Sequence, residues 1–142
     1  MTTYTKLAAD GTDLPADATG HQAVRVDHPL LAKPLIFTAF HSPKELNYRD
    51  GMKWAESLDV NGWAWRAPTV EELFFLLNRS KYPALDPSFF PDFSGYEWSW
   101  ASTPDAEDPS EFAWMVLLGD GGSYRFHQSN HGFVRAVRAG QF

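Results

Sequence analysis

The sequence predicts an α+β fold in which two helices are followed by a run of antiparallel strands. Two apolar segments with helical spacing begin at capping signals, over residues 42–58 and 69–78. The C-terminal half instead alternates apolar and polar residues in short runs between turn-forming residues, which is typical of strands. A length of 142 residues suits one domain with a real core. We therefore expect a single domain over 1–142.

The N-terminal part is predicted to hold an arm and two strands. Residues 1–20 are polar and rich in turn formers, so we expect an irregular arm laid over the domain. Residues 21–40 are β-like, with breaks around Asp27–Pro29 and near Pro34. These breaks predict two short strands joined by a turn.

The first helix is predicted to begin at Ser42. Serine is a favoured N-cap, Pro43 fits the first helical position, and Glu45 completes a capping box. Gly51 inside the helix costs roughly 1 kcal/mol relative to alanine, so we expect it to lie against a neighbouring backbone. The apolar face recurs at helical spacing and consists of Tyr48, Met52, Ala55 and Leu58.

The second helix is predicted to follow a capping box formed by Thr69 and Glu72. Pro68 favours an extended lead-in, and Asn78 is expected to end the segment in a left-handed conformation. So wide an apolar surface predicts burial on several sides; it consists of Val70, Leu73, Phe74 and Leu77, widened by Phe75 and Leu76.

The C-terminal half is predicted to form strands and loops. A strand is expected over Trp98–Ser102, followed by an acidic loop over 104–111. Alternating residues around the glycine-rich turn GDGG predict a hairpin over 112–128. Residues 132–138 are expected to form the last strand.

Charge and composition exclude several classes of protein. The formal net charge is −6 and the pI is about 5.2, which disfavours a nucleic-acid partner because phosphates need a basic patch. It leaves room for a basic protein partner. No cysteine is present, so we expect neither disulfides nor thiolate metal sites. No apolar run is long enough for membrane insertion.

Ordered motifs resemble one known family. The stretch WRAPTVEEL resembles the W-R-x-P-T-x-x-E-L core of the C-terminal domain of Legionella collagen-like adhesins. TKLAADGTDLPADAT and YRDGMKWAESL precede it, and WASTP, FAWMVLLGDGG and VRAVR follow it, in the family's order. The resemblance implies a C-type-lectin-like fold, with two helices packed on a small twisted antiparallel sheet below long loops.

The resemblance also bears on where the protein works. Many relatives carry a cysteine in the first helix and another in the last strand, and these positions correspond to Ala55 and Ala136 here. Drift is one explanation for the paired alanines. We prefer maturation in a reducing place, such as the cytoplasm of a bacterial host in which phage particles assemble, and expect the protein there or in the virion.

The sequence gives little support for enzymatic chemistry, and we expect neither catalysis nor a cofactor. Formylglycine-generating relatives of the broader fold need cysteines, which are absent here. The calcium-lectin triplets E-P-N and W-N-D are also absent. His127 and His131 with a carboxylate, or the acidic loop with calcium, remain alternatives; we expect no metal.

Several conspicuous residues are expected to be structural. Arg66 and Arg135 are each predicted to pair with an acid such as Asp50 or Glu72, because a guanidinium satisfies several acceptors at once. A catalytic or phosphate-binding role is the alternative. Trp65 and Trp100 are expected in the core.

The strongest candidate for a ligand-binding surface is SYRFHQSNHG, whose mixture of tyrosine, histidine and asparagine suits adaptable recognition. Diversified phage and bacterial proteins of the implied fold vary in this same region. We predict a phage or prophage binding module that recognises a protein or a glycan, in a homo-oligomer or a virion assembly. The alternative is a small acidic intracellular inhibitor of a basic host protein. The candidate residues are Tyr124, Arg125, His127, Gln128, Asn130 and His131.

Overall fold

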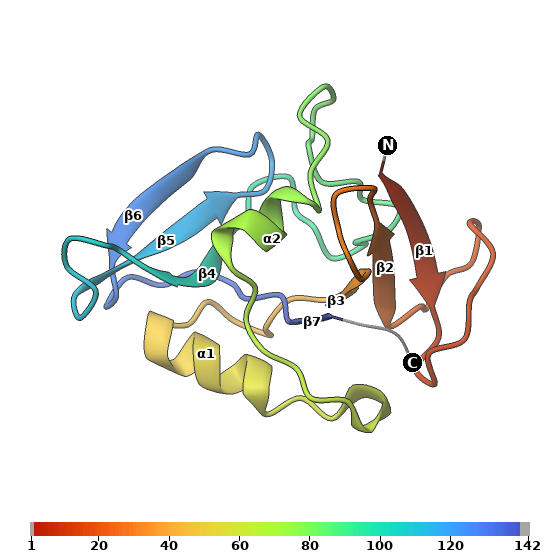
Figure 1. The fold of residues 1–142 in the computed structure, drawn as a ribbon, viewed down its shortest axis with the longest axis horizontal. Helices are drawn as coiled ribbons and strands as arrows, with labels where there is room; N and C mark the ends of the chain where they lie inside the picture. Colours follow the sequence, from red (N-terminus) through yellow and green to blue (C-terminus); the bar gives the residue numbers. More distant parts are fainter. Residues whose placement is uncertain (1, 140–142) are drawn as a thin grey trace.

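The computed structural model describes residues 2–139 and contains two small antiparallel sheets and two α-helices (Figure 1). The α+β class is therefore confirmed, but one sheet was expected and two are present. The first sheet has the order β1-β2-β3-β7 and the second the order β4-β5-β6. The elements are β1 (Thr3–Leu7), β2 (Ala23–Asp27), β3 (Leu35–Thr38), α1 (Tyr48–Glu56), α2 (Val70–Phe74), β4 (Trp98–Pro104), β5 (Phe112–Leu117), β6 (Ser123–His127) and β7 (Val137–Ala139), with a short 3-10 turn over Val60–Gly62.

The first sheet joins both ends of the described chain. β2 and β3 confirm the two strands predicted over 21–40, and β7 pairs with β3 so that Phe37 lies opposite Val137. β1 corrects the irregular arm expected over 1–20, because Thr3–Leu7 pairs along its whole length with β2. Within this polar segment Leu7 is fully buried in an apolar cluster, so pairing with β2 and burial of Leu7 together stabilise a strand that the local composition does not predict.

The second sheet is a three-stranded meander. β5 and β6 form the predicted hairpin, with Met115 opposite Tyr124. β4 is longer than the predicted strand and pairs with β5 through a register shift between Trp100 and Pro104. The predicted last strand is shorter than 132–138: Phe133 makes a parallel bridge to Ser99, and only Val137–Ala139 forms β7.

Helix α1 begins later than predicted. Its N-cap is Asn47, whose side chain accepts a hydrogen bond from the Asp50 amide. Ser42 is occupied elsewhere: its amide donates to Val134 O, and its hydroxyl accepts from the Val134 amide. Leu46 forms a bridge with the late segment at Gly132. This long-range pairing holds the segment before Asn47 extended and displaces the predicted cap.

The tight packing expected at Gly51 is present, although the neighbour is a side chain. A Cβ atom at Gly51 would lie 2.7 Å from Val134 Cγ2. The apolar face of α1 is confirmed, since Ala55 is buried and Tyr48, Met52 and Leu58 pack against the same cluster.

Helix α2 has the predicted capping box, with Thr69 and Glu72 each accepting from the other's backbone amide. It ends at Phe74. Asn78 does not end the segment in a left-handed conformation: among the non-glycine residues that the structure describes, Asn61 alone has positive φ. The Asn78 side chain instead accepts hydrogen bonds from the amide and hydroxyl of Ser80.

Two apolar clusters form the core. One gathers Leu73 and Leu76 with residues of β2, β3 and β5 and with Leu85, Phe90 and Phe93 from the long segment between α2 and β4. The other gathers Ala55, Trp65, Trp100 and Ala136. Trp65 and Trp100 are 3% and 0% exposed, which confirms their predicted place in the core.

Candidate functional site

Arg66 forms a two-point contact with Glu72, as predicted for one of its named partners. Its terminal nitrogens lie 2.6 and 2.7 Å from the two carboxylate oxygens. Burial acts to raise the pKa of Glu72, but hydrogen bonds from Arg66 and Thr69 outweigh it and hold that pKa below its usual range. Hydrogen bonding to Glu72 in turn raises the pKa of Arg66. The pair joins the extended lead-in to the first turn of α2.

Arg135 is fully buried, and its partners differ from those predicted. It donates two hydrogen bonds to Glu97 at 3.0 and 2.9 Å and one to Asp92 at 2.8 Å, not to Asp50 or Glu72. A fourth hydrogen bond reaches Ala39 O. Arg135 thus fastens the segment before β4 to the end of β3, which is a scaffolding role.

The six predicted ligand-binding residues do not form one surface. Side chains alternate along β6, so Tyr124 lies on one face of the sheet while Arg125 and His127 lie on the other. Ring contacts agree with this division: Tyr124 meets Trp98, whereas Arg125 and His127 meet Phe112.

A group of four aromatic rings, two exposed and two half-buried, lies on the Tyr124 face and is here called the aromatic cluster. The Trp98 ring is 5.5 Å from that of Tyr124 and 5.1 Å from that of Phe126, both edge to face. Trp98 Nε1 also donates to the hydroxyl of Tyr96. Tyr96 is 68% exposed and Tyr124 is 56% exposed. The cluster consists of Tyr96, Trp98, Tyr124 and Phe126.

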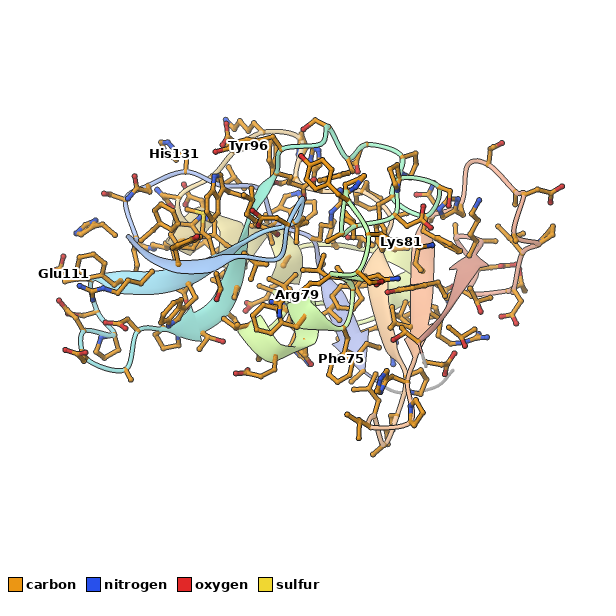
Figure 2. All side chains as sticks on the ribbon, turned by 90° about the horizontal axis from the view of Figure 1, so that it is seen from above. Phe75, Arg79, Lys81, Tyr96, Glu111 and His131 are labelled. Carbon is orange, nitrogen blue, oxygen red and sulfur yellow. The ribbon has the colours of Figure 1, made fainter. Side chains whose placement is uncertain are left out.

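Three of these rings, those of Tyr96, Trp98 and Phe126, were not predicted as site residues from the sequence. Trp98 and Trp100 alternate along one strand, which predicts a shared face, yet only Trp100 is fully buried. Joining Trp98 to Phe126 requires the strand register across β5, which the sequence does not provide. Figure 2 shows Tyr96 and His131 projecting from the same side of the molecule.

The opposite face of β6 is occupied by the acidic loop. Arg125 lies 2.8 Å from the buried carboxylate of Asp105, and its guanidinium stacks over Phe112. His127 Nε2 lies 2.7 Å from Glu111. Two of the loop's carboxylates are therefore engaged by the strand that was expected to bind the ligand.

The segment after β6 is also tied to its surroundings. The Gln128 side chain donates to Pro109 O and Phe112 O. Asn130 caps the turn, since its amide and its side chain both donate to His127 O. Of the predicted residues, Tyr124 and His131 present exposed side chains for which no hydrogen bond joins them to other described residues.

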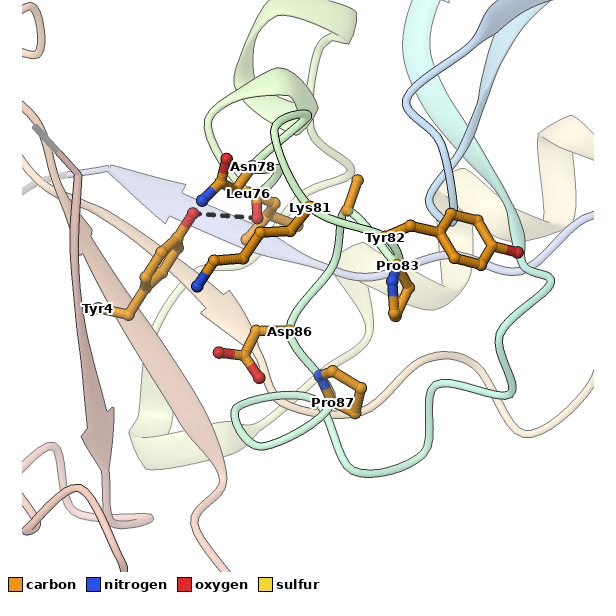
Figure 3. Close-up of a pocket in the computed structure, with 9 residues that line it drawn as sticks. Tyr4, Leu76, Asn78, Lys81, Tyr82, Pro83, Asp86 and Pro87 are labelled. Carbon is orange, nitrogen blue, oxygen red and sulfur yellow. Dashed lines mark hydrogen bonds between the residues drawn. The ribbon is translucent and has the colours of Figure 1, made fainter.

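A separate pocket of about 370 Å³ lies between β1 and the segment after α2 (Figure 3). The Tyr4 ring forms one wall, and its hydroxyl donates to Leu76 O at 3.1 Å. Burial, reinforced by the charge of Asp86, raises the pKa of Tyr4. Lys81 and Asp86 also line this pocket. Both side chains are exposed, and no ion pair joins them.

Residues 2–139 contain neither a metal-binding group of side chains nor a membrane-spanning helix. No group of three or more His, Cys, Asp or Glu side chains is arranged to hold a metal ion in this part of the chain. No described helix combines the length and the apolar character needed to cross a bilayer.

The fold is α+β with two small sheets in the described part of the chain, and the second sheet carries a partly exposed aromatic cluster. The Lcl C-terminal domain model matches residues 22–138. The chain belongs to this family, the Legionella collagen-like adhesin C-terminal domain family that its motifs indicate. No curated protein matches the chain.

Proposed function

We propose that this chain is a non-enzymatic binding module of adhesin type with a C-type-lectin-like fold, and that the aromatic cluster is its ligand-binding face. Membership in the Lcl C-terminal domain family supports an adhesin-like role. Two helices beside small antiparallel sheets, with long segments between them, are compatible with the lectin-like fold.

The observation that carries this proposal is the exposure of Tyr96 and Tyr124 beside Trp98. Large aromatic side chains are normally covered, and an exposed group of them is typical of an interaction surface. Each ring offers a broad apolar face with few rotamers to immobilise, while the hydroxyls can hydrogen-bond to a ligand. Such a surface suits a sugar ring or an apolar side chain.

The face of β6 that carries Arg125 and His127 is less suited to bind the ligand. Arg125 and His127 are engaged by Asp105 and Glu111, so a ligand would have to compete with contacts already made. Tyr124 therefore remains the central predicted residue, and Arg125 and His127 contribute less.

Alanine variants test this assignment on an array of printed polysaccharides and cell-surface proteins. Tyr124→Ala and Tyr96→Ala should weaken retention by about 1–3 kcal/mol, the range typical of tyrosine hot spots, with unchanged melting temperature. Tyr82→Ala is the matched control, because Tyr82 is 81% exposed and lies outside the cluster. Equal retention of all variants would overturn the proposed face.

The acidic-inhibitor alternative predicts a different pattern. Glu107 and Asp108 would meet a basic partner, so their alanine variants would lose most affinity and binding would fall steeply with salt. Binding of the chain to lysozyme and to histones, used as basic probes, is measured at increasing salt concentration. This measurement distinguishes the acidic-inhibitor alternative from our proposal. Under our proposal the Tyr124→Ala variant loses more than either acidic variant.

We also propose that the protein is phage- or prophage-encoded and works in the bacterial cytoplasm or in the virion, as a decoration or receptor-binding part. The absence of cysteine and the full burial of Ala55 and Ala136 support a fold that is stable without a bridge. Mass spectrometry of purified particles from an induced host tests this assignment; recovery of the chain only in the particle-free supernatant would count against the virion role.

A further inference from the structure

We infer that the outer edge of β6 is a docking site for an extended segment of a partner protein, which adds a fourth strand to the β4-β5-β6 sheet. The inference rests on the proposed function, since it names the kind of partner that the binding module takes. Among the strands within residues 2–139, β6 is an edge strand paired only with β5, and Figure 1 shows it at the outer margin of its sheet.

The hydrogen-bond pattern shows which backbone groups point outward. The Leu117 amide donates to Gly122 O, and the Gln128 amide donates to Glu111 O, both at 2.8 Å. Antiparallel strands alternate hydrogen-bonded and non-hydrogen-bonded pairs, so Tyr124 and Phe126 face β5 with their backbone groups. The amides and carbonyls of Ser123 and Arg125 therefore point away from the sheet.

No backbone or side-chain hydrogen bond within residues 2–139 reaches these outward groups of Ser123 and Arg125. Other edges are at least partly covered. Phe133 exchanges hydrogen bonds with Trp98 and Trp100 along β4, Arg66 pairs with Val137 of β7, and the Leu14 amide donates to the end of β1.

Natural edge strands are commonly protected by charged side chains. On β6 the side chains that could protect the edge in this way are Arg125 and His127. Each already contacts a carboxylate of the acidic loop: Arg125 contacts Asp105, and His127 contacts Glu111. The charge of Arg125 therefore opposes an incoming strand less than an unmatched charge would.

The outward groups suit a polypeptide better than a glycan. They repeat every second residue, at about 6.8 Å, which is the repeat of another strand. One side of the added strand would lie beside Tyr124 and Phe126, so an apolar residue fits there. The other side would lie beside Arg125, which is 50% exposed and gives Asp105 one terminal nitrogen, so a carboxylate fits there.

The probe is a capped nine-residue peptide, Thr-Val-Thr-Val-Asp-Val-Thr-Val-Thr, titrated into the full chain and followed by amide NMR. Saturable binding with new exchange protection at the Ser123 and Arg125 amides is the expected result. No binding at millimolar peptide, or binding without protection at these amides, overturns the inference.

A matched pair of variants isolates the edge. Ser123→Pro removes an outward amide that β5 does not use, whereas Ser123→Ala keeps it. We expect at least a tenfold weaker affinity for Ser123→Pro and an unchanged affinity for Ser123→Ala; equal affinities overturn the inference. Should Ser123→Pro fail to fold, N-methylated peptides decide with the wild-type chain. Methylation along one edge of the peptide should abolish binding and along the other edge should not; binding by both methylated forms overturns the docking site.

This experiment separates the edge from the aromatic cluster. Array retention that is lost in Tyr124→Ala but kept in Ser123→Pro, without peptide binding, upholds the proposed function and overturns the edge. Peptide binding that follows the Ser123 pair, with array retention indifferent to Tyr124, upholds the edge and overturns the cluster as the ligand face.

Discussion

The two terminal nitrogens of the Arg66 guanidinium donate to the two carboxylate oxygens of Glu72, at 2.6 and 2.7 Å. Glu72 also accepts a hydrogen bond from the Thr69 amide at 2.9 Å. One carboxylate therefore holds the incoming chain and caps the helix. The two functions share one carboxylate, so loss of Glu72 removes both the contact to the lead-in and half of the capping box.

Arg66→Ala should lower stability by about 1–2 kcal/mol. Losing one partner of a truly buried pair costs roughly 3–5 kcal/mol, but the Arg66 side chain is 45% exposed, and solvent weakens the pair. Arg66→Lys should show an intermediate loss, because an ammonium keeps the charge but not the two-point geometry. Urea unfolding measures both variants. Wild-type stability with lost binding would instead place Arg66 in the site.

The contribution of Glu72 to stability should disappear in acid. Its pKa in the folded protein is lowered, so the ionised form contributes fully above the usual glutamate pKa. The contribution declines as pH falls through that value and is gone below the lowered pKa. Melting temperatures of wild type and Glu72→Gln should therefore differ at neutral pH and converge in acid. A difference that stays constant with pH would contradict this linkage.

Arg135→Met should be more damaging than any change at Arg66. It leaves the fully buried carboxylate of Glu97 without its charged partner, which typically costs about 3–5 kcal/mol. Adding Glu97→Gln to the same variant should recover part of the loss, because the uncompensated charge is removed. Arg25→Ala is the control: its partners are exposed, so about 1 kcal/mol or less is expected. Calorimetry of the wild type and these three variants compares these losses.

The Ala55→Cys, Ala136→Cys double variant should form an intramolecular bridge under oxidation. Both alanines are fully buried in the same apolar cluster, and relatives are expected to carry cysteines at the corresponding positions. A bridge typically stabilises by about 2–4 kcal/mol. Thiol titration of the oxidised, folded protein reads the outcome, with Ala55→Cys alone as control. Two free thiols would show that these positions do not correspond to the cysteines of relatives.

Elements set by local signals were predictable from the sequence. The cap of α2 needs only Thr69 and Glu72 three residues apart, and the β5–β6 hairpin needs only alternation around a glycine-rich turn. Elements set by distant contacts were not. The start of α1 depends on the pairing of Ser42 with Val134, which overrides a plausible capping box.

The candidate site divides in the same way. The exposure of Tyr124 follows from its position on a polar hairpin strand, and it was predicted. The cluster with Trp98 depends on the register of strands that are not neighbours in the sheet. The pairing of Arg125 with Asp105 depends on where the acidic loop folds back. Both are tertiary facts that a linear pattern does not contain.

The buried contacts of Arg135 and Ala136 also determine how late in synthesis the chain can complete its fold. Arg135 reaches Ala39 across 96 residues of sequence, and Ala136 reaches Thr38 across 98. Closing such long loops is entropically expensive and slows folding relative to local structure. During synthesis, one edge of β3 therefore stays unpaired until β7 has emerged, and an unpaired strand edge is open to pairing with other chains during that interval.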